Sequence, residues 1–202
     1  MVLQEVPLNS RKMTVTVLLL LSLAIPASAE PIHIQDAGGS VNFSPDGGCT
    51  AALAERIGQA RKEILVECYS FTSRPIAQAL IEAHQRGVTV LVISDPTNLN
   101  GRGSMTAELE AAGVTVLYDT AHKIAHNKVM TFDGVAVATG SFNFSASAEH
   151  ANAENLLILE NAGLASIYAR RWHELREYAV PRVEVVPRKV HARDLAPEAG
   201  KP

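Results

Sequence analysis

The chain has 202 residues and a formal net charge of −3, with 47% hydrophobic, 19% charged and 5% aromatic residues. This balance excludes a disordered or fibrous protein, and the length suffices for one medium-sized domain with its own hydrophobic core. The weakly acidic charge also excludes a protein that coats nucleic acid through a global basic field, so a polyanion site has to be a local positive patch.

The first 29 residues are predicted to be a secretory signal peptide. Arg11 and Lys12 precede an apolar run over 13–25, and small residues at 27–29 follow as a cleavage site. The run is shorter than the about 20 residues that a membrane-spanning helix requires, so no stable membrane anchor is expected after cleavage. An uncleaved membrane anchor is the alternative interpretation.

Beyond residue 40 the hydrophobic pattern alternates between short strands and amphipathic helices. Strands are predicted at 41–44, 64–71, 88–94 and 114–119, and helices at 49–63, 75–86 and 104–112. Gly87 and Gly113 end two of the helices, and the segment 95–103, rich in Gly, Asn and Pro, is predicted to be a loop. Strand–helix–strand units of this length imply parallel strands joined by right-handed crossovers.

The second half of the chain has a different pattern. Its elements are two strands at 127–132 and 135–141, a strand at 154–160 and a closing helix at 163–178. Asp133 and Gly134 between the first two strands are a strong signal for a β-hairpin. We therefore expect one α/β domain over residues 30–180, with a mixed, mostly parallel β-sheet flanked by helices. Residues 181–202, with prolines and mixed charges, are predicted to form a loosely ordered tail.

Two cysteines, Cys49 and Cys68, are predicted to lie at a helix start and in a strand. Export to an oxidising compartment would permit a disulfide between them, and two separate buried thiols are an equally open alternative. Two cysteines without histidines at zinc-finger spacing do not form a four-ligand zinc site. No cofactor is expected.

Four polar side chains are predicted to meet at the hairpin. Residues two apart on a strand share a face, so His126 and Lys128 point together, and Ser141 and Asn143 repeat this spacing. A tight turn would oppose residues whose numbers sum to about 267, which brings His126 close to Ser141 and Lys128 near Thr139. Two basic groups, a hydroxyl and an amide without a nearby carboxylate cluster suit an anion with several oxygens, most simply a phosphate.

This arrangement predicts phosphoryl chemistry. An imidazole beside a bound phosphate can attack phosphorus or donate a proton to the leaving alkoxide. Lys128 and Asn143 would stabilise charge on the phosphate oxygens, and Glu154 would hold the second nitrogen of a histidine.

Simpler interpretations stay open for several residues. Ser141 can be a turn-capping hydroxyl, Glu154 an acid at a strand edge, and Asp133 a turn residue. Tyr69 and Phe71 alternate in a strand that looks buried, and they are predicted to pack in the core.

The motif itself resembles that of a known family. The segment 126–143, HNKVMTFDGVAVATGSFN, matches H-x-K-x4-D-x6-G-S-x-N, the signature of the phospholipase D superfamily. The segments FSPDGG, CYSFTSRPIAQALIEAHQRGVTVLVISD and NAENLLIL extend the likeness over residues 40–178, toward the small, single-motif, exported bacterial endonucleases of that superfamily.

The resemblance implies a metal-independent phosphodiesterase that cuts DNA, with RNA as a further candidate substrate. It also implies a homodimer with one active site across the two-fold axis, in which one His126 forms a phosphohistidine and the other His126 protonates the leaving group. Together with the signal peptide it implies a periplasmic or secreted protein. A phospholipase D acting on lipid head groups and a catalytically silent nucleic-acid-binding module are the alternatives.

The resemblance further implies roles for single residues. Lys128, Ser141 and Asn143 match phosphate-binding positions, and Glu154 matches the acid that orients a histidine. Asp133 and Gly140 match positions that are structural. His122 and Lys123 add positive charge just before the motif, and neither has a role in this scheme.

Overall fold

The computed structural model describes residue 34 and residues 37–185. The predicted signal peptide and most of the predicted tail lie outside this part of the chain. Among the described residues, no helix has both the length and the apolar character needed to cross a membrane.

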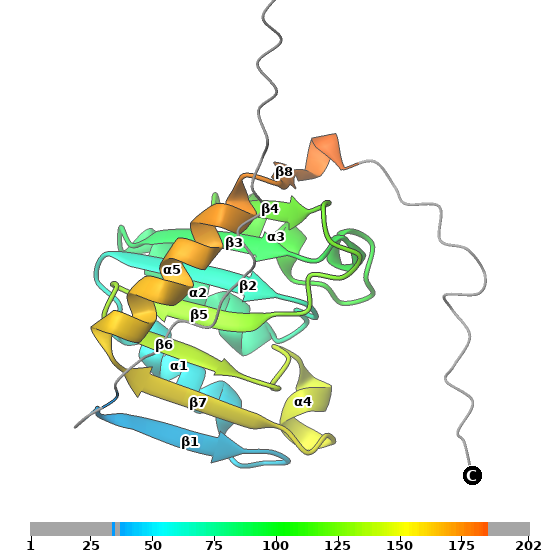
Figure 1. Cartoon of the computed structure of the whole chain (residues 1–202). Coiled ribbons are helices and arrows are strands. Elements are labelled where there is room, and N and C mark those ends of the chain that lie inside the picture. The colour runs from blue at the N-terminus through cyan, green and yellow to red at the C-terminus, as the bar shows by residue number, and fades with distance from the viewer. Residues whose placement is uncertain (1–33, 35–36, 186–202) are drawn as a thin grey trace, which may run out of the picture. The chain divides into compact units, whose positions relative to one another are not determined.

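One mixed β-sheet of eight strands forms the centre of the described part of the chain (Figure 1). In their order across the sheet, the strands are β1 (Gly39–Phe43), β7 (Asn155–Glu160), β6 (Ala136–Gly140), β5 (Lys128–Phe132), β2 (Glu63–Cys68), β3 (Thr89–Ser94), β4 (Thr115–Asp119) and β8 (Ala179–Pro181). The prediction of a single α/β domain with a mixed sheet is confirmed.

The direction of the strands differs from the prediction. Strands β2, β3 and β4 are parallel, as their connecting helices require. The other pairings between these eight strands are antiparallel, so the prediction of a mostly parallel sheet is wrong. The reason is that the hairpin β5–β6 joins the sheet beside β2 with β5 antiparallel to it, and β7 then continues the meander.

Helices cover both faces of this sheet (Figure 1). Helices α1 (Cys49–Gln59), α2 (Arg74–Gln85) and α3 (Thr106–Ala111) lie on one face, and α5 (Ala162–Arg176) crosses the other. The short elements are α4 (Ala146–His150) and the 3-10 turns η1 (Pro96–Leu99) and η2 (Arg182–Glu184).

Each face of the sheet buries its own apolar cluster, because successive strand residues point to opposite sides. Val66 packs in the cluster that contains Leu53 and Leu80 of α1 and α2. Its neighbour Leu65 packs on the other side with Trp172 of α5. The Trp172 Nε1–H donates to the Val66 carbonyl oxygen at 3.0 Å, so this indole is both buried and satisfied.

Helix α1 ends earlier than predicted. It stops at Gln59, and the backbone of Ala60 is extended. The next backbone N–H groups, from Arg61 to Glu63, donate to the carboxylate of Asp133 at 2.7–2.9 Å. These bonds from a distant turn replace the helical ones that the amphipathic pattern alone predicts.

The β5–β6 hairpin has a register one residue away from the predicted one. Asp133 and Gly134 both have positive φ, and the Val135 N–H donates to the Phe132 carbonyl oxygen, as in the expected tight turn. Phe132 pairs with Ala136, however, so opposed residues sum to 268 and Val135 is an extra, exposed residue.

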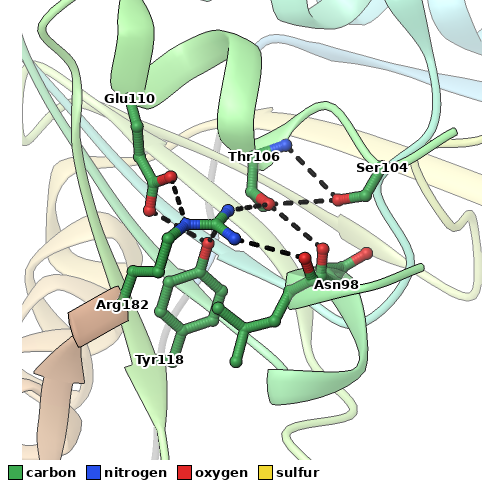
Figure 2. Close-up of polar contacts among 7 residues, drawn as sticks. Asn98, Ser104, Thr106, Glu110, Tyr118 and Arg182 are labelled. Atoms are coloured by element: carbon green, nitrogen blue, oxygen red, sulfur yellow. Dashed lines mark hydrogen bonds and ion pairs between the residues drawn. The ribbon is translucent and has the colours of Figure 1, made fainter. Parts of the chain in front are cut away.

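The beginning of the predicted tail has a defined structure. Figure 2 shows Arg182 against α3 and β4, where its Nε lies 2.6 Å from the Glu110 carboxylate. Its guanidinium also donates to the Tyr118 hydroxyl, the Leu99 carbonyl oxygen and the Thr106 hydroxyl. The prediction of a loosely ordered tail is therefore wrong at its start, because one arginine finds four polar partners.

Both cysteines are buried and free. Of the two alternatives open in the sequence, the structure thus has separate thiols rather than a disulfide. Burial raises the pKa of the Cys68 thiol to about 12, so this side chain is a neutral core residue.

Candidate active site

A cavity of about 490 Å³ opens at one edge of the sheet, where β5 and β7 begin and β6 ends. It is lined by His126, Asn127, Lys128, Val129, Thr139, Gly140, Ser141, Asn143, Glu154 and Tyr168. The cavity lining thus includes five side chains that the sequence analysis assigned to the site, and the motif glycine Gly140. The five are His126, Lys128, Ser141, Asn143 and Glu154. Asp133 does not line the cavity.

The sheet positions these residues through its strand order. Lys128 pairs with Cys68, so the start of β5 lies beside the carboxyl end of β2. Parallel α/β sheets commonly place their sites at this edge. Gly140 ends β6 with φ of 152°, and a Cβ atom there would lie 2.2 Å from the Asn155 carbonyl oxygen. This close approach of two backbones requires glycine.

Lys128 is buried, with 7% of its surface exposed. Its Nζ donates to the His126 carbonyl oxygen at 2.5 Å and lies 5.0 Å from the centre of the Tyr69 ring. Burial lowers the pKa of Lys128, and the negative charge of Glu154 partly offsets this effect. One of three N–H donors is used, so two are available to a bound anion.

His126 precedes β5 rather than lying within it, and it is exposed. Its ring lies against the Tyr69 ring, with centroids 4.6 Å apart at a tilt of 51°. Neither imidazole nitrogen has a hydrogen-bond partner within the described part of the chain. Both nitrogens are therefore accessible for chemistry with a ligand or a second protein chain.

Ser141 and Asn143 present complementary groups to the cavity. The Ser141 hydroxyl oxygen accepts from the backbone and the side-chain amide of Asn155 at 3.1 and 3.3 Å. Its own proton remains available as a donor. The Asn143 Oδ1 atom is buried and lacks a partner among the described residues. An unsatisfied buried amide is costly, which is typical of a group that meets a ligand.

Glu154 lies in the cavity, immediately before β7. Its carboxylate accepts from the Asn152 side chain at 2.9 Å, and its backbone exchanges hydrogen bonds with Ser44. It makes no hydrogen bond to His126 of the same chain. The predicted carboxylate–imidazole contact is therefore not formed within one described chain.

Asp133 is bound elsewhere. Burial alone would raise the pKa of this carboxyl, but three backbone hydrogen bonds from Glu63, Arg61 and Lys62 outweigh it and lower the pKa. The carboxylate ties the hairpin turn to the connection between α1 and β2. It holds the fold and does not face the cavity.

Three buried carboxylates, not anticipated from the sequence, support the segment 121–127 that carries His126. The contacts are Asp119 with the N–H groups of Ala121 and His122, Asp95 with that of Ala125, and Glu67 with the Asn127 side chain. They lie at the carboxyl ends of β4, β3 and β2, so consecutive parallel strands hold one loop. Burial raises the pKa of Glu67, and the Asn127 hydrogen bond partly offsets this.

His122 contacts one of these three carboxylates, that of Asp119. Its Nδ1 lies 2.7 Å from the Asp119 carboxylate, whose side chain is almost fully buried. This pairing orients the imidazole, although His122 does not line the cavity.

The site also contains two aromatic residues that the sequence analysis did not assign to it. Tyr69 is half-buried and contacts both His126 and Lys128, rather than packing in the core. Tyr168 of α5 lines the cavity. The sequence pattern places Tyr69 inside the predicted strand 64–71 and gives no signal for this role, because only the structure shows that β2 ends at Cys68.

No group of three or more His, Cys, Asp or Glu side chains that could hold a metal ion occurs among residues 34 and 37–185.

Comparison with known proteins identifies the family. The family model described as "Cardiolipin synthase, PLD-like domain" matches residues 53–176, more than half of the chain. The chain belongs to the phospholipase D-like family. The resemblance predicted from the H-x-K motif is thereby confirmed.

Relatives of this phospholipase D-like chain carry different names. It is 42% identical over 133 residues to a "Phospholipase D" of Rickettsia bellii, covering 66% of each protein. It is 32% identical over 132 residues to the "Mitochondrial cardiolipin hydrolase" of Xenopus laevis, covering 65% of this chain and 62% of that protein. The crystal structure of Nuc from Salmonella typhimurium, a phospholipase D family member, is similar with a TM-score of 0.69 and 32% identity. That match covers 72% of this chain and 98% of Nuc.

Proposed function

We propose that the chain is an exported, metal-independent phosphodiesterase that hydrolyses nucleic-acid phosphodiester bonds through a phosphohistidine at His126. The observation that carries this proposal is the cavity in which the exposed His126 imidazole, the Lys128 ammonium and the Ser141 hydroxyl meet. An accessible imidazole next to an ammonium and a hydroxyl donor suits attack on a bound phosphate.

The first step transfers the phosphoryl group to the enzyme. A neutral His126 nitrogen attacks phosphorus, and the bond from phosphorus to the leaving oxygen breaks. Lys128, the side-chain N–H of Asn143 and the Ser141 proton stabilise the negative charge on the non-bridging oxygens. A second, protonated imidazole gives its proton to the leaving alkoxide, which departs as an alcohol.

The second step returns the enzyme to its starting state. The second imidazole, now neutral, takes a proton from water while the hydroxide attacks phosphorus and the phosphorus–nitrogen bond breaks. His126 is the one histidine that lines the cavity of the described chain. The second imidazole therefore comes from His126 of a second copy, in a homodimer whose active site spans the two-fold axis.

Two classes of phosphodiester compete as substrate. The likeness to Nuc over nearly the whole of that protein supports a nucleic acid. The names of the Rickettsia and Xenopus relatives support a phospholipid as the second candidate. Both substrates would use the same two chemical steps, so only the groups flanking the phosphate differ.

Plasmid DNA cleavage by residues 30–202 in EDTA tests the proposal. We expect nicking by the wild type, a loss of more than about 10³-fold in His126→Ala, and no loss in His150→Ala, whose imidazole is exposed and outside the cavity. Choline release from phosphatidylcholine vesicles is measured in parallel. Cleavage of vesicles but not of DNA would move the assignment to a phospholipase D.

The shared site has its own test. Mixing catalytically dead His126→Ala with excess wild type should reduce activity in proportion to the mixed dimers formed, and light scattering should give twice the chain mass. A monomer that still cleaves would contradict the shared active site.

A further inference from the structure

Tyr69 lies outside the motif, and its side chain contacts both basic residues of the motif. It follows β2 directly, where the pairing of Cys68 with Lys128 brings the two strands together. Its ring lies 4.6 Å from the His126 ring, centroid to centroid, and 5.0 Å from the Lys128 Nζ. Lys128 in turn donates to the His126 carbonyl oxygen. The three residues thus form a closed triangle in which each contacts the other two.

Two other roles for the Tyr69 ring, packing in the core and stacking on a nucleotide base, agree less well with its surroundings. It is half-buried, whereas Phe71 two residues later is fully buried and packs edge-on against Phe144. The Lys128 ammonium lies over the Tyr69 ring, so this face is not available for stacking on a nucleotide base. Neither a core role nor a base-stacking role therefore explains the position of the ring.

We infer that Tyr69 is a positioning residue, whose ring holds the His126 imidazole and the Lys128 ammonium in the mutual orientation that phosphoryl transfer requires. The inference rests on the proposed function, because the orientation matters only if His126 attacks phosphorus. An exposed imidazole with no hydrogen bond at either nitrogen needs another contact to restrict its rotation, and the Tyr69 ring provides it.

The backbone of Tyr69 is itself fixed. Asn98, which is 5% exposed, donates from Nδ2 to the Tyr69 carbonyl oxygen at 2.5 Å and to the Ser94 hydroxyl at 2.9 Å. Its Oδ1 accepts from the Phe71 N–H at 3.2 Å. Thr106 in turn donates its hydroxyl to the Asn98 carbonyl oxygen, within the cluster of Figure 2. The ring is thus supported from a rigid turn, as precise positioning demands.

The test compares Tyr69→Leu, which removes the ring, with Tyr69→Phe, which keeps it. Hydrolysis of bis(4-nitrophenyl) phosphate in EDTA is followed from pH 5 to 10. We expect kcat to fall about 10- to 100-fold in Tyr69→Leu, with a smaller change in KM, and to stay within about twofold in Tyr69→Phe. Phe71→Leu is the matched control, since it disturbs the core but leaves the triangle intact.

The pH profile adds a readout that a purely structural role would not change. The titratable groups that face Lys128 are Tyr69, His126, Cys68 and Glu154. The 4-nitrophenolate leaving group departs without taking a proton, so the alkaline limb with this substrate reports deprotonation of Lys128. Loss of the ring removes its attraction for the Lys128 ammonium, so this limb should move down by about half a pH unit in Tyr69→Leu. The alkaline limb should not move in Tyr69→Phe or in Phe71→Leu. Equal kcat values and identical profiles for Tyr69→Leu and Tyr69→Phe would overturn the inference.

A spectroscopic measurement separates this outcome from failure of the proposed function. The ring protons of His126, assigned through their absence in His126→Ala, should shift on Tyr69→Leu because the ring current is lost, and should stay nearly unchanged on Tyr69→Phe. A shift without any hydrolysis by the wild type would support the contact and refute the phosphodiesterase. No shift would refute the contact, whatever the activity.

Discussion

Replacing Asp133 with asparagine should weaken the fold while leaving the chemistry of the cavity in place. The carboxylate accepts three backbone hydrogen bonds, from Lys62 and Glu63 to one oxygen and from Arg61 to the other. An asparagine keeps one oxygen acceptor but turns an NH₂ group toward the remaining N–H donor. The substitution therefore loses one hydrogen bond and removes the charge from the other two.

The size of the effect follows from these contacts. A hydrogen bond to a charged group contributes about 1.5–3 kcal/mol, and a neutral one about 1 kcal/mol. These contacts are partly exposed, so the low end of these values applies. One lost bond and two bonds weakened by about 0.5 kcal/mol each give a destabilisation of about 2.5 kcal/mol at pH 7, or about 5–10 °C in Tm.

The pH dependence has a definite sign. The pKa of Asp133 is lowered in the folded protein from its ordinary value of 3.8. Its contribution is thus complete above that value and is lost as the pH falls through the lower folded pKa. The difference between wild type and Asp133→Asn should shrink below about pH 4.

Urea unfolding at pH 7 and pH 3, with hydrolysis measured on the folded protein at 25 °C, checks this reasoning. Asp46→Asn is the matched control, because Asp46 also has positive φ but its carboxylate is exposed and contacts the exposed His150 imidazole. We expect a change within about 0.5 kcal/mol there. An Asp133→Asn protein with wild-type stability but no activity would refute the structural role.

Further outcomes follow from the site and the core. Gly140→Ala should lower both stability and activity, because its Cβ would lie 2.2 Å from the Asn155 carbonyl oxygen; wild-type melting and hydrolysis would contradict this. Trp172→Ala should cost about 3–5 kcal/mol in urea unfolding, since the indole is 1% exposed. Cys49 and Cys68 should react with a thiol reagent only after denaturation, both at once; a protein that shows no thiols even when unfolded would contain a disulfide instead.

The hairpin illustrates how far the sequence alone reaches. Asp133 and Gly134 predict the turn, because few residues adopt positive φ without strain. They do not predict the register, which is one residue away from the expected one. A bulged residue such as Val135 depends on how both strands pack against the sheet, and that information is not local.

Long-range contacts also decided the ends of elements. The apolar pattern of 49–63 suits a longer helix than α1, and only the approach of Asp133 explains why it stops at Gln59. The charged, proline-containing segment after residue 180 predicts a loosely ordered tail. Arg182 nevertheless forms hydrogen bonds to Glu110 and Tyr118, on elements more than sixty residues earlier in the chain.

The sequence by itself determined the family, the α/β class and the residues of the motif, because these depend on residue type at fixed spacing and on hydrophobic period. It also placed His126, Lys128, Ser141 and Asn143 close together, since a tight turn brings its two strands side by side. Only the tertiary structure decided what surrounds them. Strand order brings the end of β2, and with it Tyr69, against the start of β5. Neighbours in a sheet are chosen by packing over the whole domain, which no short stretch of sequence records.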